Sequence, residues 1–277
     1  MMDFVYSRRY CGRLRGVILD WAGTTMDYGC YAPAVVFVEV FKRAGVEISM
    51  EEARAPMGAH KRVHIQKITQ IEAVRQRWEA THGRPPTEED VDAMFAQFVP
   101  LQLDCLARYA DLIPGTLEAL EAFRARGLKV GSTTGYTSEM MDILQREAAA
   151  RGYVPDATVC ATDVPAGRPE PWMCLENAKR LRIFPMETIV KIGDTLPDIE
   201  EGLNAGMWTV GLAMTGNEMG LNEAEIQAAD PTLITRRRDR AYTRMAQAGA
   251  HYVVDSIADC PAIIDAINAR LARGECP

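Results

Sequence analysis

The sequence has 277 residues, of which 48% are hydrophobic and 25% are charged, a composition typical of an ordinary globular protein with one large core and room for a smaller companion domain. Its formal net charge of -7 argues against a surface for nucleic acid or an anionic membrane, although a local cationic pocket could still hold a small anion. No apolar run has the length of a transmembrane helix or a signal peptide, and the seven cysteines form no C-x-x-C pair, which suits reduced thiols better than disulfides or zinc. We therefore expect a cytoplasmic protein that acts on a small molecule.

Near the start of the chain, residues 14–19 are almost continuously aliphatic, which predicts a strand buried on both faces. Residues 31–108 then show only helical patterns. Two capping boxes, Ser49 with Glu52 and Thr87 with Asp90, mark helix starts in this block, and one longer helix is predicted from 61 to 78. The block contains no predicted strand.

From residue 114 onward the pattern alternates between helices and short apolar strands, which predicts parallel strands with right-handed crossovers. The first strand most naturally joins this sheet. We therefore predict an α/β fold, with a Rossmann-like parallel-sheet core domain made of residues 1–30 and 109–277 and an inserted all-helical cap domain over residues 31–108. The strands expected after the block are 128–132, 157–160, 188–192, 208–212 and an edge strand at 251–254.

Small polar sequences follow several of these strands. Asp20 ends the first, Thr134 follows the second, and Asp194 follows the strand that ends at 192. A parallel sheet gathers such residues at one edge, where two carboxylates can hold magnesium, and a hydroxyl together with the planar donors of Arg168 can bind phosphoryl oxygens. The alternative for Asp20 is a carboxylate that only caps a turn, and Asp194 with Asp198 could equally cap the following helix.

The ordered set of these residues resembles the haloacid dehalogenase superfamily of phosphoryl-transfer enzymes, whose nucleophile lies in a D-x-x-x-T turn such as residues 20–24. The resemblance implies that Asp20 attacks phosphorus, that Thr134 binds the phosphoryl group and that Arg168 steadies both. It also implies a magnesium ion held by Asp20, Asp194 and the backbone carbonyl of Ala22, with Asp198 orienting the metal ligands.

Ala22 departs from the superfamily, whose phosphatases carry a general acid and base Asp two residues after the nucleophile. Without that acid, ordinary phosphate esters should be poor substrates. Lys61 suggests another leaving group, because it lies near a helix start and beside Arg62, and both disfavour its ammonium form. A neutral lysine can form an imine with an aldehyde, and the imine accepts the electron pair of a breaking carbon–phosphorus bond. The alternative is an ordinary exposed lysine.

Longer strings, at residues 20–25, 27–30, 56–64, 131–137, 164–169 and 193–195, are similar to the phosphonatase branch of the superfamily. That resemblance implies a Schiff base on Lys61, with Cys30, Met57, His64 and Tyr136 around the substrate. It also implies hydrolysis of the carbon–phosphorus bond of phosphonoacetaldehyde to acetaldehyde and phosphate through an aspartyl phosphate, within 2-aminoethylphosphonate degradation. The small phosphonate is then the partner, with no nucleic acid and no membrane.

Several alternatives stay open. His60 and His64 are four residues apart and could form a metal pair, although no third ligand is suggested. The departing amine and His64 are the candidates for activating water. The chain could instead be a phosphatase or phosphomutase of the same superfamily, or a metabolite binder without turnover. Apolar residues on more than one side of the first cap helix, Val35, Phe37 and Val38, predict a homodimer through the cap.

Overall fold

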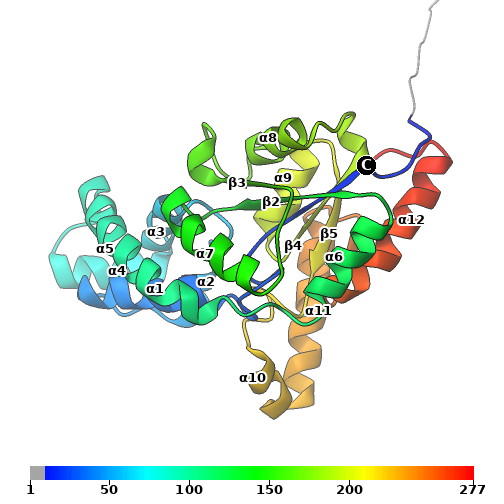
Figure 1. Ribbon diagram of the computed structural model, residues 1–277. Helices are drawn as coiled ribbons and strands as arrows, with labels where there is room; N and C mark the ends of the chain where they lie inside the picture. Colours follow the sequence, from blue (N-terminus) through cyan, green and yellow to red (C-terminus); the bar gives the residue numbers. More distant parts are fainter. Residues whose placement is uncertain (1–9) are drawn as a thin grey trace, which may run out of the picture.

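A computed structural model describes residues 10–277, and its centre is one parallel sheet of six strands in the order β3-β2-β1-β4-β5-β6 (Figure 1). The first strand pairs with β2 on one side and β4 on the other, as the α/β prediction requires. All the remaining pairings are also parallel, which confirms the predicted fold class. The strands are β1 (Gly16–Leu19), β2 (Lys129–Thr134), β3 (Ala157–Cys160), β4 (Ile189–Gly193), β5 (Trp208–Leu212) and β6 (Tyr252–Val254).

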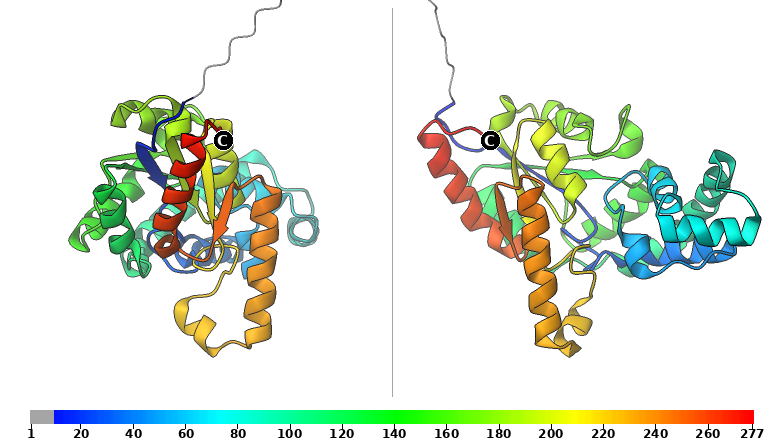
Figure 2. Two further views of the ribbon diagram at one scale, coloured as in Figure 1. Left: turned by 90° about the vertical axis from the view of Figure 1, so that its right-hand side faces the viewer. Right: turned by 180° about the vertical axis from the view of Figure 1, so that it is seen from behind.

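Helices cover both faces of this sheet (Figure 2). Ile18 packs under α8 (Trp172–Leu181), and the adjacent Lys191 meets α9 (Leu196–Asn204) on the same face. Val17 and Leu19 point to the other face, in one core with α6 (Thr116–Ala125), α7 (Ser138–Ala150) and α12 (Cys260–Ala272). Because both faces are covered, β1 is a continuous apolar run and β4 is apolar apart from Lys191, with no alternation between polar and apolar residues. The carboxyl-terminal part of α11 (Pro231–Gln247) packs on the sheet, where Met245 meets Gly211 of β5, while its start and α10 (Glu223–Ala228) project beyond the sheet (Figure 2).

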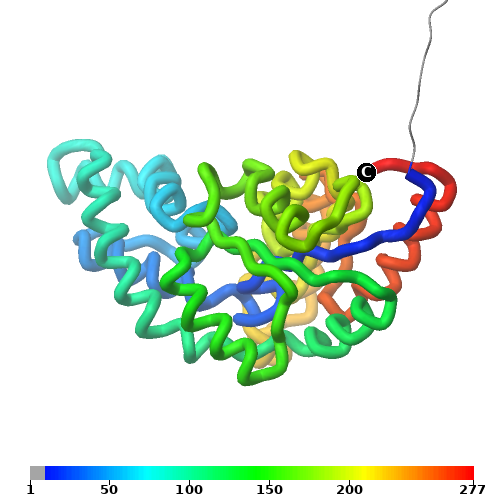
Figure 3. The backbone as a smooth tube through the Cα atoms, turned by 45° about the horizontal axis from the view of Figure 1, so that its top comes forward, coloured from blue at the N-terminus to red at the C-terminus, as the bar shows by residue number. Residues whose placement is uncertain are grey.

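The first five helices after β1 lie within residues 31–106, and Figure 3 shows this segment gathered at one end of the molecule. Both predicted capping boxes are present, at Ser49 and Thr87. The helices are α1 (Tyr31–Arg43), α2 (Met50–Arg54), α3 (Lys61–Thr69), α4 (Glu72–His82) and α5 (Glu88–Leu106). Across residues 10–277, no helix is both long enough and apolar enough to pass through a bilayer.

The single long helix predicted from 61 to 78 is wrong. The chain leaves helical geometry at Ile71, where ψ is 123°, so α3 and α4 are separate helices. Ile68 and Trp78 both enter the same buried core, although they lie on two helices. The sequence pattern showed one apolar series because both helices face that core.

Candidate active site

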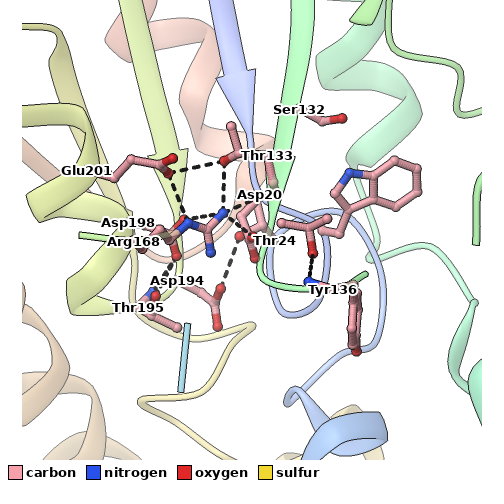
Figure 4. A network of polar contacts seen from close by, with 12 residues as sticks. Asp20, Thr24, Ser132, Thr133, Tyr136, Arg168, Asp194, Thr195, Asp198 and Glu201 are labelled. Carbon is pink, nitrogen blue, oxygen red and sulfur yellow. Dashed lines mark hydrogen bonds and ion pairs between the residues drawn. The ribbon is translucent and has the colours of Figure 1, made fainter. Parts of the chain in front are cut away.

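The Asp20 carboxylate lies at the carboxyl end of β1, where the backbone N–H of Asp20 still donates to the carbonyl oxygen of Ile192 on β4. The turn that follows is held by its own hydroxyls, since Thr25 Oγ1 donates to the carbonyl of Trp21. Asp20 is only 5% exposed, and its Oδ1 forms an ion pair with Arg168 Nη2 at 2.6 Å (Figure 4). Burial raises the pKa of Asp20, and Arg168 opposes that shift. The carboxylate is thus positioned at the sheet edge and paired with a guanidinium.

Three carboxylates meet at this edge: within residues 10–277, Asp20, Asp194 and Asp198 form the one group whose ligand atoms all lie within 4.8 Å. Asp194 accepts from Thr24 Oγ1 at 3.2 Å and from the backbone N–H of Asn217 at 2.7 Å, and no described cation pairs with it. Burial and then the Asp20 and Asp198 carboxylates raise the pKa of Asp194 well above its ordinary value. A divalent cation would relieve this repulsion, so the donor set fits a hard metal.

Asp198 differs from Asp194 because cations surround it. Lys191 Nζ lies 2.5 Å from Asp198, and Arg168 lies 3.0 Å from it. Burial alone would raise the pKa of Asp198, but Arg168 and Lys191 outweigh burial and hold that pKa below its ordinary value. Its other oxygen accepts from the hydroxyl and N–H of Thr195, so Asp198 is engaged on all sides.

Arg168 is the centre of a buried ionic network that the sequence reasoning did not find. Its Nε lies 2.9 Å from Glu201, and its Nη2 also donates to Thr133 Oγ1 at 2.8 Å (Figure 4). Glu201 and Lys191 are fully buried, like Arg168 itself. A lysine in the middle of the apolar strand β4 was the available signal, because such a residue needs a buried anion.

Thr134 ends β2 with its side chain almost fully buried. Its Oγ1 accepts the N–H of Tyr136 at 3.2 Å, and no described residue accepts its hydroxyl proton. The neighbouring Thr133, by contrast, is occupied by Arg168 and Glu201. Thr134 therefore keeps a free donor at the same edge as the carboxylates.

The loop before α3 brings Lys61 to this edge. Gly58, in a left-handed conformation (φ 93°), lies against Thr195, and the carbonyl of Ala59 lies against Gly135. A side chain at either glycine would collide with the opposite wall, so the close approach requires them. Lys61 then begins α3 with its amine 4.6 Å from the centre of the Tyr136 ring.

Burial is the largest cause of a lowered Lys61 pKa, which falls to about 8, and the Asp20 carboxylate opposes the shift. Lys61 is 5% exposed. The expected contribution of Arg62 needs correction, because Arg62 is turned toward Glu88 and Asp92, at 2.8 and 2.6 Å. The exposed-lysine alternative is therefore wrong, and the pKa of Lys61 is lowered mainly by desolvation, with a smaller effect of Arg168 and not of Arg62.

Ala22 packs against a small buried cluster that contains Cys30 and Met57. Burial raises the pKa of the Cys30 thiol well above its ordinary value, so the thiol is neutral. The nearby Asp27 caps α1 by accepting the N–H groups of Tyr31 and Ala32, both at 2.9 Å. Its burial raises the pKa of Asp27 to about 7. The sequence analysis included Asp27 in the motif at residues 27–30 but did not predict that its carboxylate caps a helix.

His60, which precedes α3, and His64 within α3 have separate surroundings. His64 is fully buried, stacks on Phe37 with ring centres 3.8 Å apart, and bonds the carbonyl of Ala53 through Nε2 at 2.8 Å. Burial and then Lys61 lower the pKa of His64 well below its ordinary value. His60 instead lies over Phe95. Neither joins the carboxylate group, so the structure lends no support to a metal site at the two histidines.

Comparisons with known proteins agree with this geometry. Residues 14–206 match the family model for haloacid dehalogenase-like hydrolases, so fold and site define a hydrolase of that class. The chain is 54% identical to a phosphonoacetaldehyde hydrolase-like protein of Syntrophobacter fumaroxidans, over 100% of both chains, and 51% identical to a phosphonoacetaldehyde hydrolase of Nitratidesulfovibrio vulgaris, over 100% of this chain and 99% of the relative. A crystal structure of a phosphonoacetaldehyde hydrolase-like protein from Oleispira antarctica superposes with a TM-score of 0.96 at 42% identity, covering 100% of each chain. The chain therefore belongs to the phosphonoacetaldehyde hydrolase family.

Proposed function

We propose that this chain is an enzyme that hydrolyses the carbon–phosphorus bond of phosphonoacetaldehyde to acetaldehyde and phosphate, in 2-aminoethylphosphonate degradation. The names of its relatives, at up to 54% identity, support this substrate. The observation that carries the chemistry is a buried lysine, with its pKa lowered to about 8, beside a carboxylate nucleophile and an alanine in the usual place of the acid. A phosphatase would need that acid for an alkoxide leaving group.

In the first step, the neutral Lys61 amine attacks the aldehyde carbon, and one proton is taken up from solvent as water is lost, which leaves a protonated imine on Nζ. The lowered pKa makes the neutral amine available near neutral pH. Tyr136, whose ring lies next to the amine, together with Met57 and Cys30, encloses the aldehyde end of the substrate in this proposal.

In the second step, an Asp20 oxygen attacks phosphorus and the carbon–phosphorus bond breaks. The electron pair of that bond passes to the imine, which becomes an enamine and needs no side-chain acid. Arg168 holds Asp20 and the free hydroxyl of Thr134 donates to the phosphoryl group. Protonation of the enamine carbon and hydrolysis of the resulting imine release acetaldehyde and restore Lys61.

In the third step, water attacks phosphorus of the aspartyl phosphate, which releases phosphate and restores Asp20. Two groups are candidates for accepting the proton of that water. His64 has an unpartnered Nδ1, but its pKa is well below the ordinary value. The Lys61 amine, with a pKa of about 8, is the stronger base, and we propose it for this step.

We further propose magnesium, held by Asp20, Asp194 and the backbone carbonyl of Ala22. Two observations support this assignment. The buried carboxylates lie close together and no described cation pairs with Asp194, and the backbone at Gly23 lies close against the Asp194 carboxylate. Bound there, the ion would neutralise charge on the carboxylates and the phosphoryl oxygens. Asp198 would orient the site through Thr195 and Lys191 rather than hold the ion, since its oxygens are already engaged.

We also propose that residues 31–108 form a separate cap domain and that the protein is a homodimer through this cap. Phe37 is buried against His64 and Phe98, whereas Val35 and Val38 are only partly buried and could meet a second copy. Sedimentation showing a monomer at micromolar concentration would refute the dimer.

The seven cysteines, all within the described residues, form no disulfide, and on that ground we propose a cytoplasmic location.

Phosphate release from phosphonoacetaldehyde and from an alkyl phosphate monoester tests the proposed function. A phosphonate hydrolase releases phosphate only from the first substrate. A phosphatase or phosphomutase of the same fold would process the monoester at least as fast, and a binder without turnover would release phosphate from neither. Either of the latter two results would overturn the proposal.

A further inference from the structure

A cavity of about 520 Å³ between α2 and α11 is lined by an unusual number of arginines. Arg54 comes from α2, and the other arginines come from one side of α11. Only two acidic residues, Glu51 and Glu218, share the lining. None of the proposed catalytic or metal-binding residues lines this cavity. We name these five residues the arginine cluster: Arg54, Arg236, Arg237, Arg240 and Arg244.

Much of the charge of the arginine cluster is not neutralised within residues 10–277. Arg236 has no ion pair there, and the nearest carboxylate oxygen to Arg240, on Glu51, is 4.0 Å away. Arg237 donates to a backbone carbonyl, and only Arg244 has a close carboxylate partner, at 2.7 Å. Positive charge therefore accumulates in a cavity of a chain whose net charge is -7.

Arg54 contributes a buried charge to the same cavity. The residue is 8% exposed, and its Nη1 donates to the carbonyl of Gly29, while its buried Nη2 has no hydrogen-bond partner among the described residues. A buried donor without a partner is costly, and a charged one more so. The Arg54 guanidinium lies 5.0 Å from the centre of the Tyr31 ring, and no described carboxylate pairs with it, so it adds positive charge to the wall of the cavity.

We propose that the arginine cluster binds a phosphate-bearing polyanion, at a site separate from the catalytic one. A planar guanidinium group can donate two parallel hydrogen bonds to two oxygens of one phosphate. The five guanidinium groups of the arginine cluster offer more donors than a single phosphate can engage. The volume of about 520 Å³ also accommodates a ligand larger than one phosphate. This inference does not depend on the proposed function.

The site would connect two parts of the chain. An anion held there bridges α2 of the helical segment and α11 of the sheet domain. Asn217 also lines the cavity, bonds the backbone carbonyl of Arg54 through its side chain at 3.3 Å, and donates its N–H to Asp194. The occupant thus lies next to the loop that supports Asp194.

Calorimetric titration of the full-length protein with inorganic pyrophosphate, without added divalent ions, tests this proposal. The double variant Arg236→Gln/Arg240→Gln should bind pyrophosphate at least tenfold more weakly than the unaltered chain. The matched control is Arg146→Gln, an exposed arginine on α7 without an ion pair in the described structure, and it should bind normally. Absence of binding to the unaltered chain at millimolar pyrophosphate, or equal binding by the double variant, would overturn the proposal. Unchanged phosphonate turnover shows that the double variant is folded.

Discussion

The proposed mechanism makes activity depend on the protonation of Lys61. Burial lowers the pKa of Lys61 from 10.5 to about 8. The amine is therefore protonated below that pH and neutral above it. Since only the neutral amine attacks an aldehyde, kcat/KM for phosphonoacetaldehyde should rise tenfold per pH unit below about pH 8 and level off above it.

The lowered pKa of Lys61 determines how much of its amine is neutral and reactive near neutral pH. At pH 7 about one tenth of the amine is neutral when the pKa is about 8, against roughly one part in three thousand for an ordinary lysine. Burial therefore increases the reactive fraction about 300-fold, which corresponds to roughly 3.4 kcal/mol between the two protonation states. An exposed lysine at this position would give a slow enzyme near neutral pH.

The assay is phosphate release at low substrate concentration between pH 6 and 10. Lys67→Met is the matched control, because Lys67 is exposed on the same helix and should leave the profile unchanged. Lys61→Met should abolish turnover. A flat profile across this range, or a rise that continues toward pH 10, would refute the reasoning about Lys61.

Three further predictions concern the carboxylates. Ala22→Asp should lower kcat/KM for the phosphonate at least tenfold, because the new carboxylate and the phosphonate dianion repel each other. At about 6 Å, two such charges repel by roughly 3 kcal/mol at a partly desolvated site. Unchanged cleavage would contradict this prediction. Asp194→Asn should sharply raise the magnesium concentration needed for half-maximal turnover, and full activity at low magnesium would exclude Asp194 from the metal site. Lys191→Met leaves the buried Asp198 and Glu201 with Arg168 alone, so the free energy of unfolding in urea should fall by about 3–5 kcal/mol. An unchanged urea midpoint would show that Lys191 does not hold the network together.

The parallel sheet was predictable because its strands are short apolar runs separated by helical patterns, and the edge that carries Asp20 and Asp194 follows from parallel connection alone. Capping residues also fixed the starts of α2 and α5. The break between α3 and α4 was not predictable, since the apolar series continues across Ile71 without a proline or glycine.

The environment of the site residues depends on contacts between distant segments. Sequence placed Lys61 at a helix start, but its desolvation depends on the close approach of Gly58 and Ala59 to the segments that follow β4 and β2. Glu201 lies on the buried side of α9, and only the fold brings it to Arg168. Pairings of this kind have no local signal in the sequence.

Reduction with borohydride during turnover tests the central claim most directly. If Lys61 forms an imine with phosphonoacetaldehyde, borohydride should inactivate the enzyme only when substrate is present, and peptide mapping should find one covalent adduct, on Lys61. An adduct on Lys67 or elsewhere, or no adduct while Lys61→Arg still turns over, would contradict the imine mechanism.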